Sequence, residues 1–296
     1  MTVPRIGFGT APVLGRIGKK QSLRALHHAH NLGVRHFDTA RSYGWGEAER
    51  VLGEFLKGHP RDSYTIVSKC GIVPVRRSPY MAAAKAVARR VVSLWPQSRA
   101  LVTRVASTAH FQPTRTYDVE ALRTSLHASL RELRTSYLDV LLLHNFDPQV
   151  PGFEQVLGLF IDLRAAGLIR RFGFSVEGDL HQGLAFLDRH DALTGSVVQA
   201  PVSRQLFELP ERWRSVSFVT HSPFRYLHGA DPDGAPLDLQ QLLISLSAAC
   251  RCEALVTSMF SRKHIEQNVR AGDAAARFVR SAPDVSNGGG EEGALR

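Results

Sequence analysis

Residues 36–53 of this 296-residue chain read HFDTARSYGWGEAERVLG. A short apolar run ends at Asp38, and Tyr43 follows five residues later on a glycine-flanked turn. The apolar residues after this turn recur at the spacing of an amphipathic helix. In a parallel α/β protein the rim where strands lead into helices carries the chemistry, so Asp38 and Tyr43 are candidate site residues.

Most of the chain repeats this strand–helix pattern, which favours a parallel sheet or barrel. The predicted strands cover residues 6–10, 34–39, 64–69, 137–143, 169–175, 197–199, 216–222 and 255–258. The predicted helices cover residues 22–32, 47–57, 119–134, 153–166, 180–189, 237–250 and 262–271. Roughly eight β–α units result, and this number predicts a (β/α)₈ TIM barrel of the α/β class.

One long segment interrupts the repeat after the third strand. No aspartate or glutamate occurs from Ser63 to Tyr117, whereas arginines are frequent there. We expect residues 73–117 to form a basic insertion that projects from the active-site rim, because it directly follows Lys69. Connections of this length are uncommon and tend to be functional lids or disordered segments. A lid over the substrate is the favoured role, and a basic amphipathic helix that binds an anionic membrane surface is the alternative.

The domain prediction is a single barrel over residues 1–272, including the insertion, followed by a disordered tail over residues 273–296 that is rich in Gly, Ser and charge. The chain enters its first strand directly, and no apolar run is long enough to cross a bilayer. We therefore expect a cytoplasmic protein with reduced thiols.

The formal net charge of +10 favours anionic partners, such as a phosphorylated cofactor or an acidic substrate. Nucleic acid is not favoured, because the basic stretches lack interleaved aromatic residues. We expect no metal site, since the one-residue spacing of Cys250 and Cys252 is not that of a zinc ligand pair. The absence of a Gly-x-Gly-x-x-Gly motif argues against a Rossmann dehydrogenase.

Four polar residues at strand ends form the candidate catalytic set: Asp38, Tyr43, Lys69 and His144. A free tyrosine has a pKa of about 10, which a nearby ammonium lowers. We expect Lys69 to lower the pKa of Tyr43 in this way, and Asp38 to hold the charge of Lys69 in place. His144 is placed to donate a hydrogen bond to a substrate oxygen.

The stretch from Asp38 to Gly53 resembles the signature of the aldo-keto reductase family: Asp-Thr-Ala, two residues, Tyr-Gly-x-Gly, then Glu and Leu-Gly. The resemblance extends to residue 272. It implies an NADP-dependent oxidoreductase that interconverts a carbonyl (aldehyde, ketone or sugar) and an alcohol by hydride transfer. It also implies that Tyr43 is the general acid/base, that Lys69 and Asp38 tune it, and that His144 orients the small-molecule substrate.

The same resemblance implies a set of cofactor contacts, with NADPH favoured over NADH by charge. Val176 replaces the asparagine that normally follows Ser175, and the segment 258–264 departs most from the family pattern. This departure supports an alternative function, a binding or regulatory protein of this family with weak or no turnover. The implied cofactor-binding residues are Thr10, Ser175, Gln199, His221, Ser222, Phe224, Ser258, Arg262, Lys263, His264 and Asn268.

Overall fold

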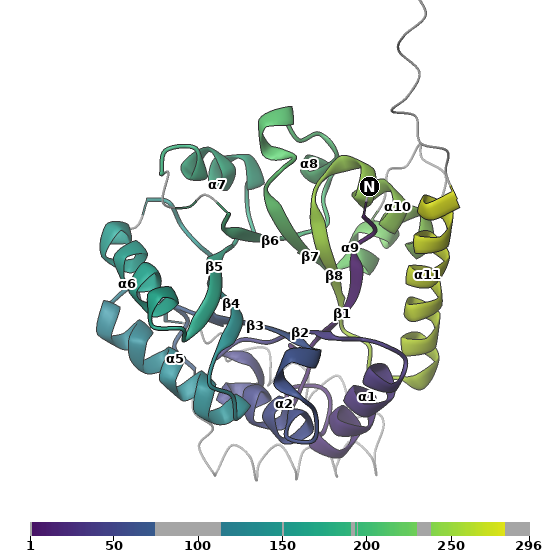
Figure 1. The fold of residues 1–296 in the computed structure, drawn as a ribbon, viewed down its shortest axis with the longest axis horizontal. Helices are drawn as coiled ribbons and strands as arrows, with labels where there is room; N and C mark the ends of the chain where they lie inside the picture. Colours follow the sequence, from purple (N-terminus) through teal and green to yellow (C-terminus); the bar gives the residue numbers. More distant parts are fainter. Residues whose placement is uncertain are drawn as a thin grey trace, which may run out of the picture.

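The computed structural model describes residues 2–74, 114–149, 151–190, 193, 195–229 and 238–281. Eight parallel strands follow one another in sequence order, and the last pairs with the first to close a barrel. The helices surround these strands (Figure 1). The predicted (β/α)₈ TIM barrel is therefore confirmed.

The strands are short, as in other barrels of this kind, and each predicted strand is present. The interior is filled by small and branched side chains, namely Val67, Val140, Leu142, Val197, Val219, Ala254 and Val256. The opposite faces of the strands pack against the helices in a larger core. The strands are β1 (Arg5–Gly9), β2 (His36–Asp38), β3 (Thr65–Cys70), β4 (Leu138–Leu143), β5 (Ile169–Ser175), β6 (Val197–Pro201), β7 (Ser217–His221) and β8 (Cys252–Thr257).

The longer helices match the predicted ones, and several short helices fall in loops where none was predicted. Asp118 begins one long helix as its side chain accepts a hydrogen bond from the Ala121 N–H at 2.7 Å. The longer helices are α1 (Lys19–Asn31), α2 (Ala48–Leu56), α5 (Val119–Leu133), α6 (Phe153–Ala165), α7 (Leu180–Leu187), α10 (Leu239–Ala249) and α11 (Arg262–Ser281). The short ones are η1 (Tyr43–Gly46), η2 (Arg61–Ser63), α8 (Arg204–Phe207), η5 (Glu211–Trp213) and α9 (Pro223–His228).

The last helix corrects the predicted start of the tail. We expected helix to residue 271 and disorder from residue 273, but α11 continues to Ser281. A Cβ on Gly272 would lie 3.0 Å from Ile6, so this glycine allows close packing of the helix on β1. Ala275 is fully buried. The packing of α11 and its alanine-rich sequence thus extend the helix beyond Gly272, the glycine that suggested its end. Residues 282–296 lie outside the described part of the chain.

The insertion begins and ends at the rim of the barrel. Gly71 and Thr116 are joined by a backbone hydrogen bond of 2.8 Å, and Ile72 forms an antiparallel bridge with Arg115. This paired stem leaves the barrel at the carboxyl end of β3. Residues 75–113, which make up most of the predicted basic insertion, lie outside the described residues. Among the helices that are described, none combines the length and the apolar content needed to span a bilayer.

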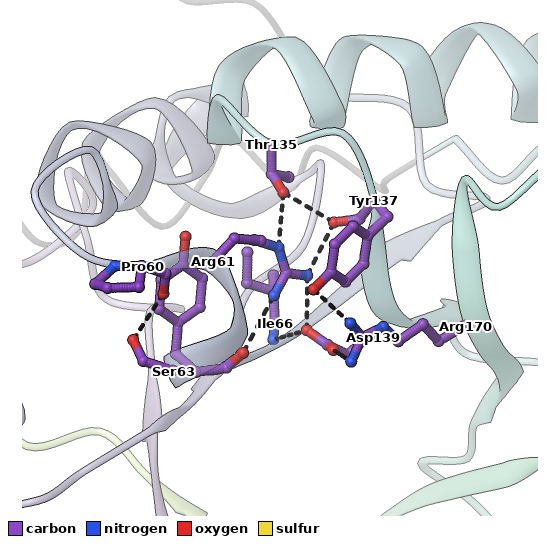
Figure 2. A network of polar contacts seen from close by, with 9 residues as sticks. Pro60, Arg61, Ser63, Ile66, Thr135, Tyr137, Asp139 and Arg170 are labelled. Carbon is purple, nitrogen blue, oxygen red and sulfur yellow. Dashed lines mark hydrogen bonds and ion pairs between the residues drawn. The ribbon is translucent and has the colours of Figure 1, made fainter.

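The amino ends of the strands carry a separate polar network (Figure 2). The Arg61 guanidinium lies 3.7 Å from the ring centre of Tyr137 and donates to Asp139 at 2.7 Å. Arg170 forms an ion pair with the other oxygen of Asp139 at 3.3 Å. Asp139 also accepts from the Ile66 N–H at 2.9 Å, which joins β3 to β4. This end of the barrel is therefore held by structural ion pairs.

A β-bulge in β8 lies at the same end of the barrel, where the strands begin. Phe218 pairs with Cys252 and Val219 with Ala254, so Glu253 is an extra residue in β8. A bulge redirects a side chain, and Glu253 forms a bidentate ion pair with Arg171 at 2.6 and 2.7 Å. Ser217 donates a third hydrogen bond, and Arg171 and Ser217 lower the pKa of Glu253 to about 2 against the effect of burial.

Candidate active site

A buried ion pair joins Lys69 and Asp38 at the carboxyl ends of adjacent strands. Lys69 Nζ lies 2.8 and 2.9 Å from the two carboxylate oxygens and donates to the Thr39 carbonyl at 2.9 Å. Burial alone would lower the pKa of Lys69, but Asp38 and then Tyr43 outweigh burial and raise it. The ammonium is therefore charged at neutral pH.

Tyr43 begins the short helix η1, whose backbone is unusual. Gly44 and Trp45 both have left-handed conformations, with φ of 58° and 64°. A Cβ on Gly44 would lie 2.5 Å from the Val13 carbonyl oxygen, so only glycine fits this close approach. The turn places the Tyr43 ring centre 4.9 Å from Lys69 Nζ. The predicted neighbours Tyr43, Lys69 and Asp38 are thus brought together.

The pKa of Tyr43 differs from our expectation. Burial raises it, and the charge of Lys69 lowers it. Asp38 raises it again, and the net result is a pKa above the ordinary value. The predicted contribution of Lys69 has the right sign, but the predicted net lowering is wrong, because burial and the Asp38 carboxylate disfavour the phenolate more than Lys69 favours it.

His144 directly follows β4 and faces Tyr43. The two rings meet edge to face with centroids 5.8 Å apart. Burial, then the charge of Lys69, lowers the pKa of His144 to about 3, so its imidazole is neutral at physiological pH. Nδ1 is buried and has no hydrogen-bond partner among the described residues. A neutral imidazole with one N–H suits hydrogen bonding to an oxygen of a bound molecule.

Two residues that hold the tyrosine turn were not predicted. Arg41 donates to the Gly46 carbonyl at 3.0 Å and to the fully buried Glu49 at 2.9 Å. Glu49 also accepts from Ser68 at 2.7 Å, next to Lys69 in β3. Burial raises the pKa of Glu49, while Ser68 and Arg41 oppose this. One sequence signal existed: Glu49 lies three residues before the core residue Leu52 and so shares its apolar helix face.

The predicted nicotinamide contacts lie against the ion pair, on β5 and β6. Gln199 is buried and donates from Nε2 to Asp38 Oδ2 at 2.6 Å. The Ser175 hydroxyl accepts from the backbone N–H of Asn145 at 2.8 Å. Thr10 donates from its hydroxyl to the Asp38 carbonyl at 3.0 Å. Gln199 and Thr10 therefore both contact Asp38, and Ser175 lies opposite Gln199 in the β5–β6 pair.

Asn145 is a further residue that the sequence analysis missed. It has a left-handed backbone with φ of 51°. Its side-chain oxygen is buried, with no hydrogen-bond partner in the described part of the chain. The backbone N–H of the same residue is bound to Ser175, so this unpaired amide oxygen lies near the end of β5, where a bound molecule could be recognised. The sequence did carry a signal for Asn145, because it directly follows His144 at the end of a predicted strand.

The predicted residues at and after the end of β7 form another part of the rim. His221 Nδ1 lies 2.9 Å from the Ser222 hydroxyl, and burial lowers the pKa of His221. Asp38 and Lys69 also act on this pKa, with opposite signs, so His221 lies near the ion pair. Ser222 has φ of 59° and begins α9, where Phe224 is 40% exposed.

The predicted adenosine-side residues lie where β8 leads into α11. Ser258, Arg262, Lys263 and His264 are exposed. Arg262 donates to Glu266 at 2.9 Å. Asn268 differs from these, because it is buried and its amide contacts Thr257 at 3.2 Å and the sulfur of Met259 at 3.6 Å. In the described ranges no three His, Cys, Asp or Glu side chains cluster as a metal site would require.

Comparison with known proteins adds independent findings. A family model described as the Aldo/keto reductase family matches residues 5–223. Aldo-keto reductase AFTS1 of Alternaria alternata is 32% identical over 163 residues, which are 54% of this chain and 41% of that protein. NADH-specific methylglyoxal reductase of Escherichia coli is 24% identical over 181 residues, 58% of this chain and 48% of that protein. The chain thus spans less than half the length of these relatives.

A solved structure agrees over most of the chain. It is an aldo/keto reductase from Klebsiella pneumoniae in complex with NADP and acetate, and it matches with a TM-score of 0.63 and 24% identity. The match covers 92% of this chain and 86% of that one. At 24% identity, this similarity shows that the two chains share a fold and shows nothing further.

Proposed function

The chain belongs to the Aldo/keto reductase family, and from this premise we propose that it is an NADP-dependent oxidoreductase. It interconverts the carbonyl of an aldehyde, ketone or sugar with an alcohol. The observation that carries the proposal is the charged, buried Lys69–Asp38 pair beside Tyr43, with the neutral His144 opposite. General acid catalysis on a carbonyl needs such a set: a proton donor, a charge that stabilises its conjugate base, and an orienting hydrogen-bond donor.

In the proposed reduction, the Tyr43 hydroxyl and the imidazole N–H of His144 donate hydrogen bonds to the substrate carbonyl oxygen. Tyr43 is protonated at neutral pH, as a proton donor requires, because the ordinary pKa of a phenol is about 10 and burial raises it further. When Tyr43 gives up its proton to the developing alkoxide, Lys69 stabilises the phenolate. Asp38 keeps Lys69 charged and in position.

The residues at the barrel mouth fit a nicotinamide cofactor. Its carboxamide would be held by the Ser175 hydroxyl, the unpaired Asn145 oxygen and Gln199, so that Asn145 offsets the asparagine that Val176 replaces. The reduced nicotinamide, when bound, would supply the hydride. Arg262 and Lys263 begin α11, where a helix N-terminus and two cations favour a phosphate. NADP is therefore the proposed cofactor, although one relative is named as NADH-specific.

Fluorescence titration with NADPH and NADH, followed by turnover assays on aldehydes, ketones and aldoses, tests the proposal. We expect micromolar binding of NADPH and turnover of at least one carbonyl class. Tyr43→Phe should bind NADPH like the wild type and lose turnover by at least about a hundredfold. Tyr226→Phe, which removes a hydroxyl outside the catalytic set, is the matched control. Wild-type turnover by Tyr43→Phe would contradict the assignment of Tyr43.

The second candidate is a family member that binds a ligand with weak or no turnover. It is favoured by Asn268, whose amide is engaged inside the protein rather than presented at the surface. NADPH binding without turnover of any carbonyl class would support it. The lid role of residues 73–117 and a cytoplasmic location remain predictions.

A further inference from the structure

Two cysteines lie next to each other at the end of the barrel opposite the candidate active site. Cys250 follows the last residue of α10, and Cys252 begins β8. Both are free and buried. Neither takes part in the chemistry proposed above, which uses the carboxyl ends of the strands.

The backbone draws these two residues together. The Cys252 N–H donates to the Cys250 carbonyl at 2.9 Å, which closes a three-residue turn around Arg251. In a fully extended chain, residues two apart have Cα atoms about 6.6–7.2 Å apart, and a turn of this kind shortens that separation. Disulfides need a Cα separation of about 4.4–6.8 Å. The Cys250 thiol donates to the Leu246 carbonyl at 3.7 Å, and the Cys252 sulfur lies 3.4 Å from the Thr220 hydroxyl.

A cavity gives small molecules access to the pair. Its volume is about 300 Å³, and the residues that line it include Cys250, Cys252, Thr2, Arg214 and Arg251. Cys70 provides a contrast, since it is buried at the carboxyl end of β3 and does not line this cavity.

The environment also distinguishes the two thiols. A hydrogen bond to Cys252 raises the pKa of Cys250. Burial alone would raise the pKa of Cys252, but hydrogen bonds from Cys250 and Thr220 outweigh burial and lower it. Cys252 is therefore the better nucleophile at neutral pH, whereas burial raises the pKa of Cys70 to about 12.

We propose that Cys250 and Cys252 form a redox-active dithiol that a small disulfide, entering through the cavity, oxidises to an intramolecular disulfide. The Cys252 thiolate attacks one sulfur of the small disulfide, and the first thiol leaves. The Cys250 sulfur then attacks Cys252 in the mixed disulfide, and the second thiol leaves. The two protein protons end on the two released thiols, so the protein is oxidised by two electrons and the small disulfide is reduced.

The test uses the full-length protein and oxidised glutathione as the oxidant. We expect the intact mass to fall by the mass of two hydrogens and peptide mapping to find a Cys250–Cys252 link. Cys70→Ser should react in the same way. Cys250→Ser should stop at a glutathione adduct on Cys252, because the second thiol is missing. Cys252→Ser should react at least about tenfold more slowly, because the remaining thiol, that of Cys250, is poorly ionised.

Native-state alkylation checks that the fold is intact: Cys70 should stay unmodified while Cys250 and Cys252 react. The proposal is overturned if the wild type does not react, if it stops at a mixed disulfide, or if a link forms only under conditions that also expose Cys70. A link in Cys252→Ser between Cys250 and Cys70 would overturn it as well.

Discussion

Gln199 donates a hydrogen bond of 2.6 Å to Oδ2 of Asp38, although the two residues lie 161 positions apart in the chain. The same carboxylate accepts from Lys69. Gln199, which resembles a cofactor-binding residue by its place in the sequence, therefore also supports the buried ion pair. Because Gln199 has two roles, its contribution to stability has to be measured in the ligand-free protein, where its contribution to cofactor binding is absent.

Gln199→Leu should lower the free energy of unfolding of the ligand-free protein by about 1–3 kcal/mol, because a buried carboxylate loses a donor. Urea denaturation measures this loss. The control is Gln205→Leu, which removes an exposed bond from Gln205 to Asp179 and the bond that Gln205 accepts from the Leu180 N–H, and should cost less because no buried ion pair depends on either bond. Equal losses in the two variants would show that the bond to Asp38 contributes no more than a surface contact.

Lys69→Met should destabilise the protein by about 3–5 kcal/mol, because it leaves the buried charge of Asp38 unpaired. In Lys69→Met with Asp38→Asn, no charge remains, so much of the stability should return. Turnover should stay lost in both variants, since neither has a cation beside Tyr43. Recovery of turnover together with stability would mean that Lys69 acts only as a structural residue.

The pH dependence of carbonyl reduction follows from two pKa values. His144 is neutral above pH of about 3, and Tyr43 keeps its proton to a pH above its ordinary value of about 10. With saturating cofactor, kcat should therefore be independent of pH across the neutral range. It should fall only at alkaline pH, where Tyr43 loses its proton. A stopped-flow or steady-state profile checks this. A decline centred near pH 7 would indicate a phenol with a lowered pKa.

His36 should make the fold sensitive to acid. Burial lowers its pKa to about 4, whereas an unfolded histidine titrates near about 6.5. Between these values the unfolded chain binds more protons, so the free energy of unfolding falls as the pH drops from about 6.5 to about 4, by up to about 1.4 kcal/mol per pH unit for this group. His36→Leu should lose less stability between pH 7 and pH 5 than the wild type.

The control for His36 is His228→Leu, at an exposed histidine, which should keep the wild-type acid sensitivity. His144 also has a lowered pKa, so part of the sensitivity should remain in His36→Leu. The ion-paired Glu253, with a pKa of about 2, contributes only at lower pH. An unchanged pH dependence in His36→Leu would show that His36 is not protonated on unfolding in this range.

Arg262→Ala with Lys263→Ala should weaken NADPH binding by about tenfold or more and leave NADH binding nearly unchanged, because only NADPH carries the additional phosphate. High salt should reduce the wild-type preference. Arg270→Ala is the control, since Arg270 also contacts Glu266, at 3.9 Å, but lies two turns further along α11. Equal losses for both cofactors would mean that these cations only stabilise the helix.

The barrel and the candidate catalytic set were predictable because they depend on local patterns. Strand and helix periods indicated the order of elements. Asp38 ends β2, Lys69 is the last residue but one of β3, and His144 directly follows β4. Contacts between distant segments were not predictable. Glu49 binds Ser68, and Asn145 meets Ser175, only because the closed barrel brings them together. The pKa of Tyr43 was mispredicted for the same reason, since burial depends on the whole fold.

The contact between Gly44 and the Val13 carbonyl has a consequence for engineering. Loops at the mouth of a barrel are usually regarded as independent sites for sequence diversification. Here the loop after β1 and the loop after β2 form one unit, since the first supplies the surface against which the second folds. Random libraries that vary residues 11–18 to alter ligand preference should therefore also displace Tyr43, the proposed proton donor, and inactive members should outnumber those with new specificity.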